Sequence, residues 1–161
     1  PDAEALFAAL AQKVRAAVSP DTALVGIYTG GVWLAQRLKR ELGLATPVGT
    51  MDVSFYRDDF EKIGLHKNVK RTDLPFEVEG RDILLLDDVL YTGRTIRAAL
   101  NELFDYGRPA RVRLAALIDR GGRELPIAAE FVGAEYPLPH SQSIELTMDD
   151  GGKFSLKLHQ D

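Results

Sequence analysis

A run of four aliphatic residues, 83–86, is followed immediately by two aspartates, Asp87 and Asp88. An unbroken apolar run of strand length is typical of a strand buried on both faces, as in parallel sheets covered by helices. Two adjacent carboxylates repel each other, so such a pair at a strand end is a poor choice merely for capping a helix. The feature therefore predicts an α/β fold in which a buried strand ends at a polar site.

The rest of the chain alternates between helix-like and strand-like patterns around this run. Apolar residues spaced by three or four predict helices over 2–18, 32–42 and 93–106. Short apolar runs predict strands over 23–28, 48–56, 83–86 and 112–118. Two more runs, 144–148 and 154–158, flank a Gly-Gly turn and are typical of a β-hairpin. This order predicts a central, mainly parallel sheet flanked by helices, with a C-terminal β-hairpin.

The length of 161 residues fits a single domain, which we expect to span 1–161 with a flexible loop over about 57–73. The chain has no cysteine, which excludes disulfides, thiolate zinc sites and a cysteine nucleophile. No apolar run reaches the roughly 18 residues that a membrane-spanning helix needs, and residues 1–4 lack the basic region of a signal peptide. These features predict a cytoplasmic protein without a membrane segment.

The formal net charge of -4 is distributed unevenly along the chain. Residues 94–123 contain seven arginines and three acidic residues, whereas residues 124–161 contain two lysines and seven acidic residues. The negative net charge argues against a protein that binds nucleic acid over its whole surface. It is still compatible with nucleic-acid binding at a local basic patch. These counts alone favour a solvated charged face over a polyanion site.

The residues that follow 83–86 carry the chemistry, because ligands of open α/β sheets bind beyond the carboxyl ends of the strands. After the two acids come Thr92, Gly93, Arg94 and Thr95. They offer hydroxyls, backbone N–H groups at a helix N-terminus and a glycine that allows close approach. Acids beside such an anion cradle suit a ligand that carries both a sugar diol and a phosphate.

The alternative interpretation is an aspartate N-cap followed by a glycine turn. It accounts for one acid and one glycine, and it leaves the second acid and the Thr-Gly-Arg-Thr run unexplained. Neither a Walker A pattern nor G-x-G-x-x-G occurs, which disfavours an ordinary ATPase or a dinucleotide-binding fold.

At these residues the chain resembles the type I phosphoribosyltransferases. Their signature for 5-phosphoribosyl-1-diphosphate (PRPP) is an apolar strand, two acids and a Thr-Gly-x-Thr loop. Within that family, segments 87–95, 54–59 and 119–126 resemble the proteins that combine uracil phosphoribosyltransferase activity with regulation of pyrimidine operons. The resemblance implies the type I phosphoribosyltransferase fold, with a small hood above the sheet.

The resemblance also implies roles for individual residues. Asp87, Asp88 and Arg57 would act in catalysis, and the two acids are candidates for contacting the Mg²⁺ that PRPP carries. The segment expected to bind PRPP or UMP is Asp87, Asp88, Val89, Leu90, Tyr91, Thr92, Gly93, Arg94 and Thr95. The pyrophosphate loop is Thr29, Gly30 and Gly31. The base hood is Asp119, Arg120, Gly121, Gly122 and Arg123. The bifunctional proteins that the chain resembles commonly carry an arginine where this chain has Gly30 and a histidine where it has Gly122.

The implied reaction converts uracil and PRPP to UMP and diphosphate. Breaking the bond to pyrophosphate builds positive charge on the ribose ring and negative charge on the leaving group, so the protein needs charge placement rather than a nucleophile. Mg²⁺ on PRPP and the backbone of 29–31 would offset the negative charge, and closure of loop 57–73 would exclude water.

Other functions stay open at this stage. The same chain could be an RNA-binding regulator that senses UMP or UTP and holds pyrimidine-operon mRNA through residues 94–123, with or without much catalytic activity. It could also be a purine phosphoribosyltransferase acting on hypoxanthine or guanine, with the same PRPP motif and a different hood. Trp33, which lies at helical spacing, and the family resemblance favour a homodimer or a higher homo-oligomer.

Overall fold

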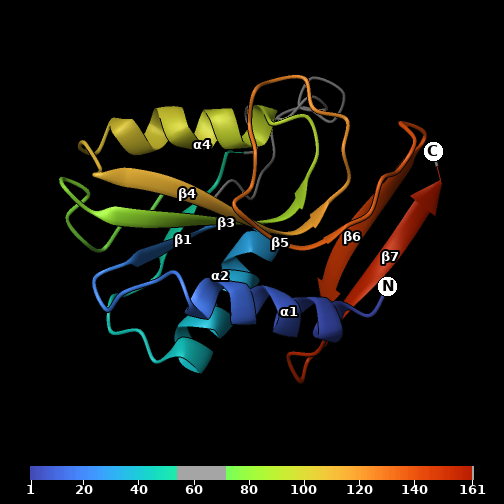
Figure 1. Ribbon diagram of the computed structural model, residues 1–161, viewed down its shortest axis with the longest axis horizontal. Helices are drawn as coiled ribbons and strands as arrows, with labels where there is room; N and C mark the ends of the chain where they lie inside the picture. Colours follow the sequence, from blue (N-terminus) through green and yellow to red (C-terminus); the bar gives the residue numbers. More distant parts are fainter. Residues whose placement is uncertain (54–71, 161) are drawn as a thin grey trace.

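The computed structural model describes residues 1–53 and 72–160 (Figure 1). In that part of the chain, five strands pair in parallel in the order β2-β1-β3-β4-β5. The strands are β1 (Ala23–Ile27), β2 (Gly49–Met51), β3 (Asp82–Leu90), β4 (Arg111–Asp119) and β5 (Phe131–Glu135). The central parallel sheet expected from the sequence is therefore confirmed.

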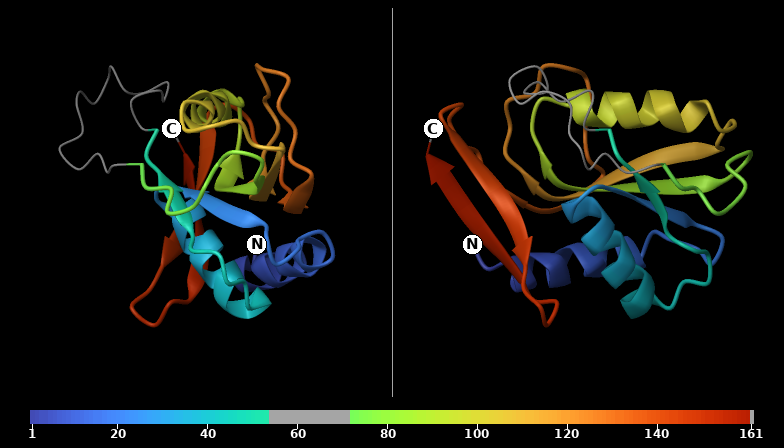
Figure 2. Two further views of the ribbon diagram at one scale, coloured as in Figure 1. Left: turned by 90° about the vertical axis from the view of Figure 1, so that its left-hand side faces the viewer. Right: turned by 180° about the vertical axis from the view of Figure 1, so that it is seen from behind.

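Helices cover both faces of this sheet. The helices are α1 (Ala3–Arg15), α2 (Gly30–Leu42) and α4 (Arg94–Phe104). Figures 1 and 2 show α1 and α2 on one face and α4 on the other. Leu84 and Leu86 of β3 belong to the core beneath α1 and α2, whereas Ile83 and Leu85 belong to the core beneath α4. The run 83–86 is thus buried on both faces, as its unbroken apolar sequence predicted.

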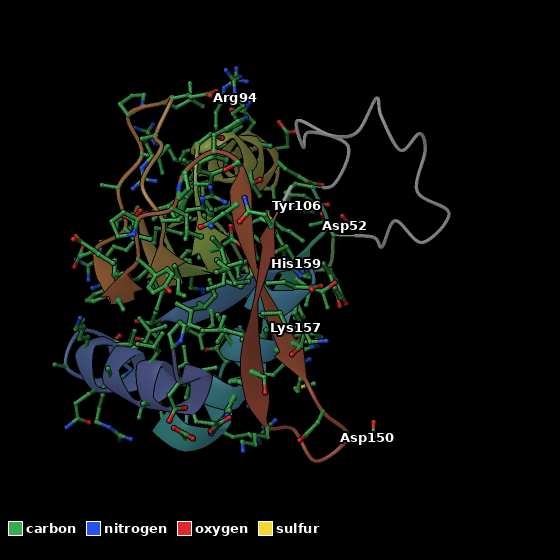
Figure 3. All side chains as sticks on the ribbon, turned by 90° about the vertical axis from the view of Figure 1, so that its right-hand side faces the viewer. Asp52, Arg94, Tyr106, Asp150, Lys157 and His159 are labelled. Carbon is green, nitrogen blue, oxygen red and sulfur yellow. The ribbon has the colours of Figure 1, made fainter. Side chains whose placement is uncertain are left out.

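A hairpin of β6 (Gln142–Met148) and β7 (Phe154–Gln160) packs beside α1 (Figure 1). The Glu4 carboxylate accepts hydrogen bonds from two Arg37 nitrogens at 2.8 and 2.6 Å and from the Phe154 N–H at 2.7 Å. The Arg37 hydrogen bonds are the largest influence on the pKa of Glu4, which is lowered to about 2. One carboxylate therefore joins α1, α2 and the hairpin. Lys157 and His159 project from β7 in Figure 3.

The predicted helices 2–18, 32–42 and 93–106 correspond to α1, α2 and α4, with small differences at their ends. Asp2 caps α1, because its carboxylate accepts hydrogen bonds from the Glu4 and Ala5 N–H groups. Gly43 ends α2 in the left-handed conformation, with φ +64°, which a glycine adopts at little cost. The hairpin also agrees with its prediction.

Two strands differ from the sequence prediction. The predicted strand 48–56 is only Gly49–Met51 in the structure, and its last three residues lie outside the described part. No strand was predicted where β5 lies. The backbone of Gly133 in β5 packs so closely that an added Cβ would lie 2.5 Å from the Leu117 carbonyl oxygen. Contact with β4, rather than local apolar pattern, explains this strand.

No helix within residues 1–53 and 72–160 combines the length and the apolar character that crossing a membrane requires.

Candidate active site

The two adjacent aspartates lie inside β3, not beyond it as the sequence predicted. Asp87 pairs with Ala116, and the parallel pairing of β3 with β4 continues as far as Leu90 and Asp119, so both acids lie within the strand. Asp87 is buried and Asp88 is half-buried. Successive side chains of a strand point to opposite faces, so the two carboxylates flank the end of β3 instead of standing side by side.

Each aspartate is oriented by the backbone. The Asp88 N–H donates to Asp87 Oδ1 and the Val89 N–H donates to Asp88 Oδ1, both at 2.9 Å. These bonds fix the carboxylates relative to the strand before any ligand binds.

Glycines bring the predicted pyrophosphate loop, 29–31, into direct contact with β3. A Cβ on Gly31 would lie 2.2 Å from the Leu86 carbonyl oxygen, and a Cβ on Gly30 would lie 2.5 Å from Asp88 Oδ2. Such distances are too short for real atoms, so only glycine allows the α2 N-terminus to approach this closely. An arginine at position 30, as the family commonly has, would force the Asp88 side chain to move.

Residues 91–95, which the family resemblance assigns to the 5′-phosphate and which are called the phosphate loop below, turn from β3 into α4. Gly93 precedes the helix in the left-handed region, with φ +94°. The Thr92 side chain is buried, and its hydroxyl accepts a hydrogen bond from the Arg94 N–H at 3.1 Å. N–H groups in the first turn of a helix have no acceptor within the helix and, together with the helix dipole, favour an anion. Residues 92–95 therefore have the local geometry expected of an anion cradle, and binding of a phosphate there stays a prediction.

The predicted hood, 119–123, and the residue after it are hydrogen-bonded to the end of β3 and to the phosphate loop. The Arg120 N–H donates to the Leu90 carbonyl oxygen at 3.0 Å, and the Glu124 N–H donates to the Thr92 carbonyl oxygen at 2.9 Å. Arg94 Nε lies 2.9 Å from Glu124 Oε1. Figure 3 shows Arg94 at the end of α4 that faces this loop. Hood and phosphate loop thus form one connected unit.

The polar side chains of the hood bind one another. Arg123 Nη2 donates to Asp119 Oδ2 at 2.6 Å, and the Gly121 N–H donates to Asp119 Oδ1 at 3.0 Å. Partial burial alone would raise the pKa of Asp119, but the Arg123 guanidinium and the Gly121 N–H hold the pKa below its usual range. Asp119 is therefore an anion that orients Arg123.

Tyr91 is the centre of a second group of contacts. The Arg120 guanidinium lies over the Tyr91 ring, 3.8 Å from its centroid. The Tyr91 hydroxyl is hydrogen-bonded to His140 Nδ1, and the Tyr91 carbonyl oxygen accepts from Arg123. A Cβ on Gly122 would lie 2.4 Å from the Tyr91 ring, so a histidine at position 122 does not fit this arrangement. Arg120 and Arg123 are thus directed at the phosphate loop, which the sequence did not predict.

His140 and Glu124 are site residues that the sequence interpretation missed. His140 lies 49 positions from Tyr91, and Glu124 lies 30 positions from Arg94. No local pattern could reveal these contacts, because each pair meets only after β4 has joined the sheet beside β3. Arg57 and most of the predicted loop 57–73 lie outside the described residues.

The arginine-rich stretch 94–123 is largely engaged in contacts of its own. Arg111 and Arg113 contact Asp82 at 2.8 and 3.1 Å, in addition to the contacts of Arg94, Arg120 and Arg123 given above. Asp82 and Glu124 lie outside residues 94–123 and were therefore not included when the charges of that stretch were counted. In the structure these two acids pair with arginines of the stretch and offset part of its positive charge. The basic patch is therefore weaker than its composition suggested.

The donor set at the end of β3 fits a magnesium ion that shares its ligands with a phosphorylated substrate. Mg²⁺ prefers carboxylate, phosphate and water oxygens, and one or two protein carboxylates are the usual contribution. Asp87 and Asp88 offer such oxygens near the end of β3, which leads directly into loop 91–95.

Comparisons with known proteins agree with this geometry. A family model described as "Phosphoribosyl transferase domain" matches residues 1–139. The chain is 53% identical over 137 residues to the "Bifunctional protein PyrR" of Nitrosococcus oceani, which covers 84% of this chain and 77% of the relative. It is 51% identical over 151 residues to the protein of the same name from Pseudomonas savastanoi pv. phaseolicola, which covers 91% of this chain and 89% of the relative.

A solved structure of a hypoxanthine-guanine phosphoribosyltransferase from Bacillus anthracis is similar in fold. The TM-score is 0.65 at 20% sequence identity, over 84% of this chain and 79% of that one. The corresponding enzyme from Leishmania tarentolae, in complex with GMP, gives a TM-score of 0.62 at 18% identity, over 85% of this chain and 79% of that one. At these identities the similarity concerns the fold alone.

Proposed function

The chain belongs to the phosphoribosyl transferase family and, within it, to the PyrR family, and from this premise we propose that it converts uracil and PRPP to UMP and diphosphate. The observation that carries the proposal is the packing of Gly31 against the backbone of β3 at Leu86. This contact brings loop 29–31 close to Asp87 and Asp88. The strand that carries the two acids continues directly into loop 91–95. This arrangement supports the assignment of the three neighbouring elements to the pyrophosphate, the diol and the 5′-phosphate of one substrate.

Each element would perform a separate task on PRPP. Asp87 and Asp88 would accept hydrogen bonds from the ribose hydroxyls, and their negative charge would stabilise the positive charge that develops on the ring. The N–H groups of loop 91–95 and of the first turn of α4 would bind the 5′-phosphate. The backbone of 29–31 would receive the leaving pyrophosphate. No protein nucleophile is required.

Magnesium bound to PRPP, when present, would neutralise part of the pyrophosphate charge and so make it a better leaving group. Asp87 and Asp88 are the residues that would contact it. Arg57 and loop 57–73 stay predictions for closure over the site, since most of that segment is outside the described residues.

The test is an initial-rate assay with the purified chain, PRPP and Mg²⁺, in which uracil, hypoxanthine and guanine are compared as acceptors. We expect UMP from uracil and no nucleotide from the purines. Formation of IMP or GMP without UMP would instead establish a purine enzyme, and formation of no nucleotide from any base would refute the enzymatic proposal.

We further propose that the chain regulates pyrimidine-operon mRNA in response to UMP or UTP. The name "Bifunctional protein PyrR" carried by relatives of 51% and 53% identity supports this second function. Among the described residues, the side chains of Arg97 and Arg108 are exposed and have no ion pair, so they are the arginines of 94–123 best suited to RNA phosphates.

Measuring RNA affinity against salt concentration tests this regulation. Replacing Arg97 and Arg108 by glutamine should reduce the slope of log affinity against log salt by about 1.4, since each phosphate contact on single-stranded RNA contributes about 0.7. Arg111→Gln is the control, because Arg111 contacts Asp82. If pyrimidine-leader RNA binds no better than random RNA in the presence of UMP, the regulatory proposal is wrong. A cytoplasmic location, expected from composition, and a homo-oligomeric state, expected from Trp33 and the family resemblance, stay predictions.

A further inference from the structure

We propose that Arg120 is a positioning residue for phosphoribosyl transfer, which acts through the ring of Tyr91 to hold the phosphate loop, 91–95, in its PRPP-binding conformation. The inference rests on the proposed enzymatic function and assigns a task to a residue that the sequence placed in the base hood.

The first observation is that Arg120 is buried without a carboxylate partner among residues 1–53 and 72–160. Only 4% of its surface is exposed, and its Nε is a buried donor with no hydrogen-bond partner among the described residues. Its Nη2 donates to the Pro139 carbonyl oxygen at 3.0 Å. Arg113, which is buried to a similar degree, lies 3.1 Å from Asp82 and 3.8 Å from Glu130. Burying a guanidinium without an anion is costly, so this placement needs a different explanation.

The compensation for Arg120 is the face of an aromatic ring. Its guanidinium lies 3.8 Å from the centroid of the Tyr91 ring, which is a close cation–π contact. A cation–π contact is stronger in a buried place than at the surface, because water no longer competes with the ring for the cation. Arg120 and Tyr91 therefore stabilise each other in this position.

The second observation is that the Tyr91 ring is held on its other sides as well. Its edge lies against the backbone of Gly122, where an added Cβ would be only 2.4 Å away, and its hydroxyl is hydrogen-bonded to His140. Arg120 therefore contacts one face of the ring, Gly122 lies along one edge, and His140 binds its hydroxyl. The backbone of Tyr91 opens the phosphate loop, so fixing the ring fixes the start of that loop.

The third observation is the local balance of charge. Within the described residues Arg120 has no ion pair, so its positive charge is not neutralised by a carboxylate where it lies beneath the first residue of the loop. A loop proposed to receive a phosphate dianion gains from a nearby cation that is fixed in place. Orientation of the loop and electrostatic support therefore come from the same side chain.

The experiment compares PRPP affinity and turnover in five variants and the wild-type chain. Arg120→Met keeps the length of the side chain and removes its charge and planar group. Tyr91→Leu removes the ring, and Tyr91→Phe removes only the hydroxyl. The double variant Arg120→Met with Tyr91→Leu tests whether the two residues act together. Arg81→Met is the matched control, since Arg81 lies over the Phe76 ring at 5.6 Å, away from the site.

We expect Arg120→Met to raise the KM for PRPP about tenfold, with a smaller change in kcat. Tyr91→Leu should raise it at least as much, and the double variant should be no worse than Tyr91→Leu alone. Tyr91→Phe, which keeps the ring and loses only the hydrogen bond to His140, should raise the KM for PRPP less than Tyr91→Leu does, and Arg81→Met should leave the KM unchanged. Calorimetric titration with PRPP should reproduce the changes as losses of affinity.

A purely structural role would lower the melting temperature and the active fraction while the active molecules kept the wild-type KM and affinity for PRPP. That result would overturn the positioning role, as would independent, additive effects of the two substitutions. A wild-type chain that binds no PRPP would overturn the proposed enzymatic function and this inference with it. If the wild-type chain binds PRPP and the Arg120→Met variant has the same affinity and the same KM for PRPP, only the inference about Arg120 is overturned.

Discussion

Substitution of Gly31 by alanine tests whether contact between loop 29–31 and β3 is essential. The added methyl group would lie 2.2 Å from the Leu86 carbonyl oxygen and 3.0 Å from its carbonyl carbon. Normal contact between carbon and oxygen needs roughly 1 Å more, since non-bonded carbon atoms pack at about 3.5 Å or beyond. Leu86 is fully buried in the middle of the sheet and cannot yield, so the N-terminus of α2 must move instead.

The expected loss of stability is that of an overpacked core, about 1–3 kcal/mol. For a domain of this size, such a loss lowers the melting temperature by roughly 3–10 °C. A displacement of about 1 Å between binding elements can reduce the rate of reaction by about 100-fold. Thermal unfolding and initial rates of UMP formation measure the two effects on the same sample.

Gly151→Ala is the matched control for Gly31→Ala. Gly151 lies in the turn of the hairpin, and an added Cβ would approach the Asp149 side chain no closer than 3.4 Å, an ordinary contact. We expect this variant to keep wild-type stability and activity. A Gly31→Ala protein with unchanged melting temperature and unchanged kcat/KM would refute the reasoning, because the site would then tolerate separation of the loop from the acids.

Two other substitutions have sharp expected outcomes. The double variant Asp87→Asn with Asp88→Asn should abolish transfer in the uracil assay. Its melting temperature, followed by circular dichroism, should change much less than for a core substitution. A loss of stability like that caused by a core cavity would mean that the acids are structural. Glu4→Gln should destabilise the chain by about 2 kcal/mol at pH 7, because it breaks charge-assisted hydrogen bonds to Arg37. Since folding lowers the pKa of Glu4 from 4.5 to about 2, the carboxylate stabilises the fold fully above about pH 5 and loses this effect as the pH falls towards 2. Unfolding curves of wild type and Glu4→Gln should therefore converge between pH 5 and pH 2, and parallel curves over that range would contradict the assignment.

Local sequence patterns predicted the elements whose own residues determine them. The run 83–86 is a strand buried on both faces, and Gly43 ends a helix in the left-handed conformation. The hairpin follows from alternating residues around a Gly-Gly turn. In each case the physical cause, burial or backbone freedom, acts over a few neighbouring residues.

Features that depend on distant partners were beyond the reach of such patterns. β3 continues through Asp87 and Asp88 because β4 lies alongside, although two carboxylates disfavour a strand locally. β5 exists because it pairs with β4. The stacking of Arg120 on Tyr91 likewise joins residues 29 positions apart, so the sequence could place both in the site without indicating that they touch.

The measurement that tests the central claim most directly is calorimetric titration of PRPP with Mg²⁺ into the wild-type chain and into the Asp87→Asn, Asp88→Asn double variant. If Asp87, Asp88, loop 29–31 and loop 91–95 bind one substrate together, each wild-type chain should bind one molecule of PRPP. The double variant should then lose affinity by at least about tenfold, since hydrogen bonds to charged groups contribute roughly 1.5–3 kcal/mol each. Equal affinity of the two proteins for PRPP would contradict the claim that these elements form a phosphoribosyl-binding site.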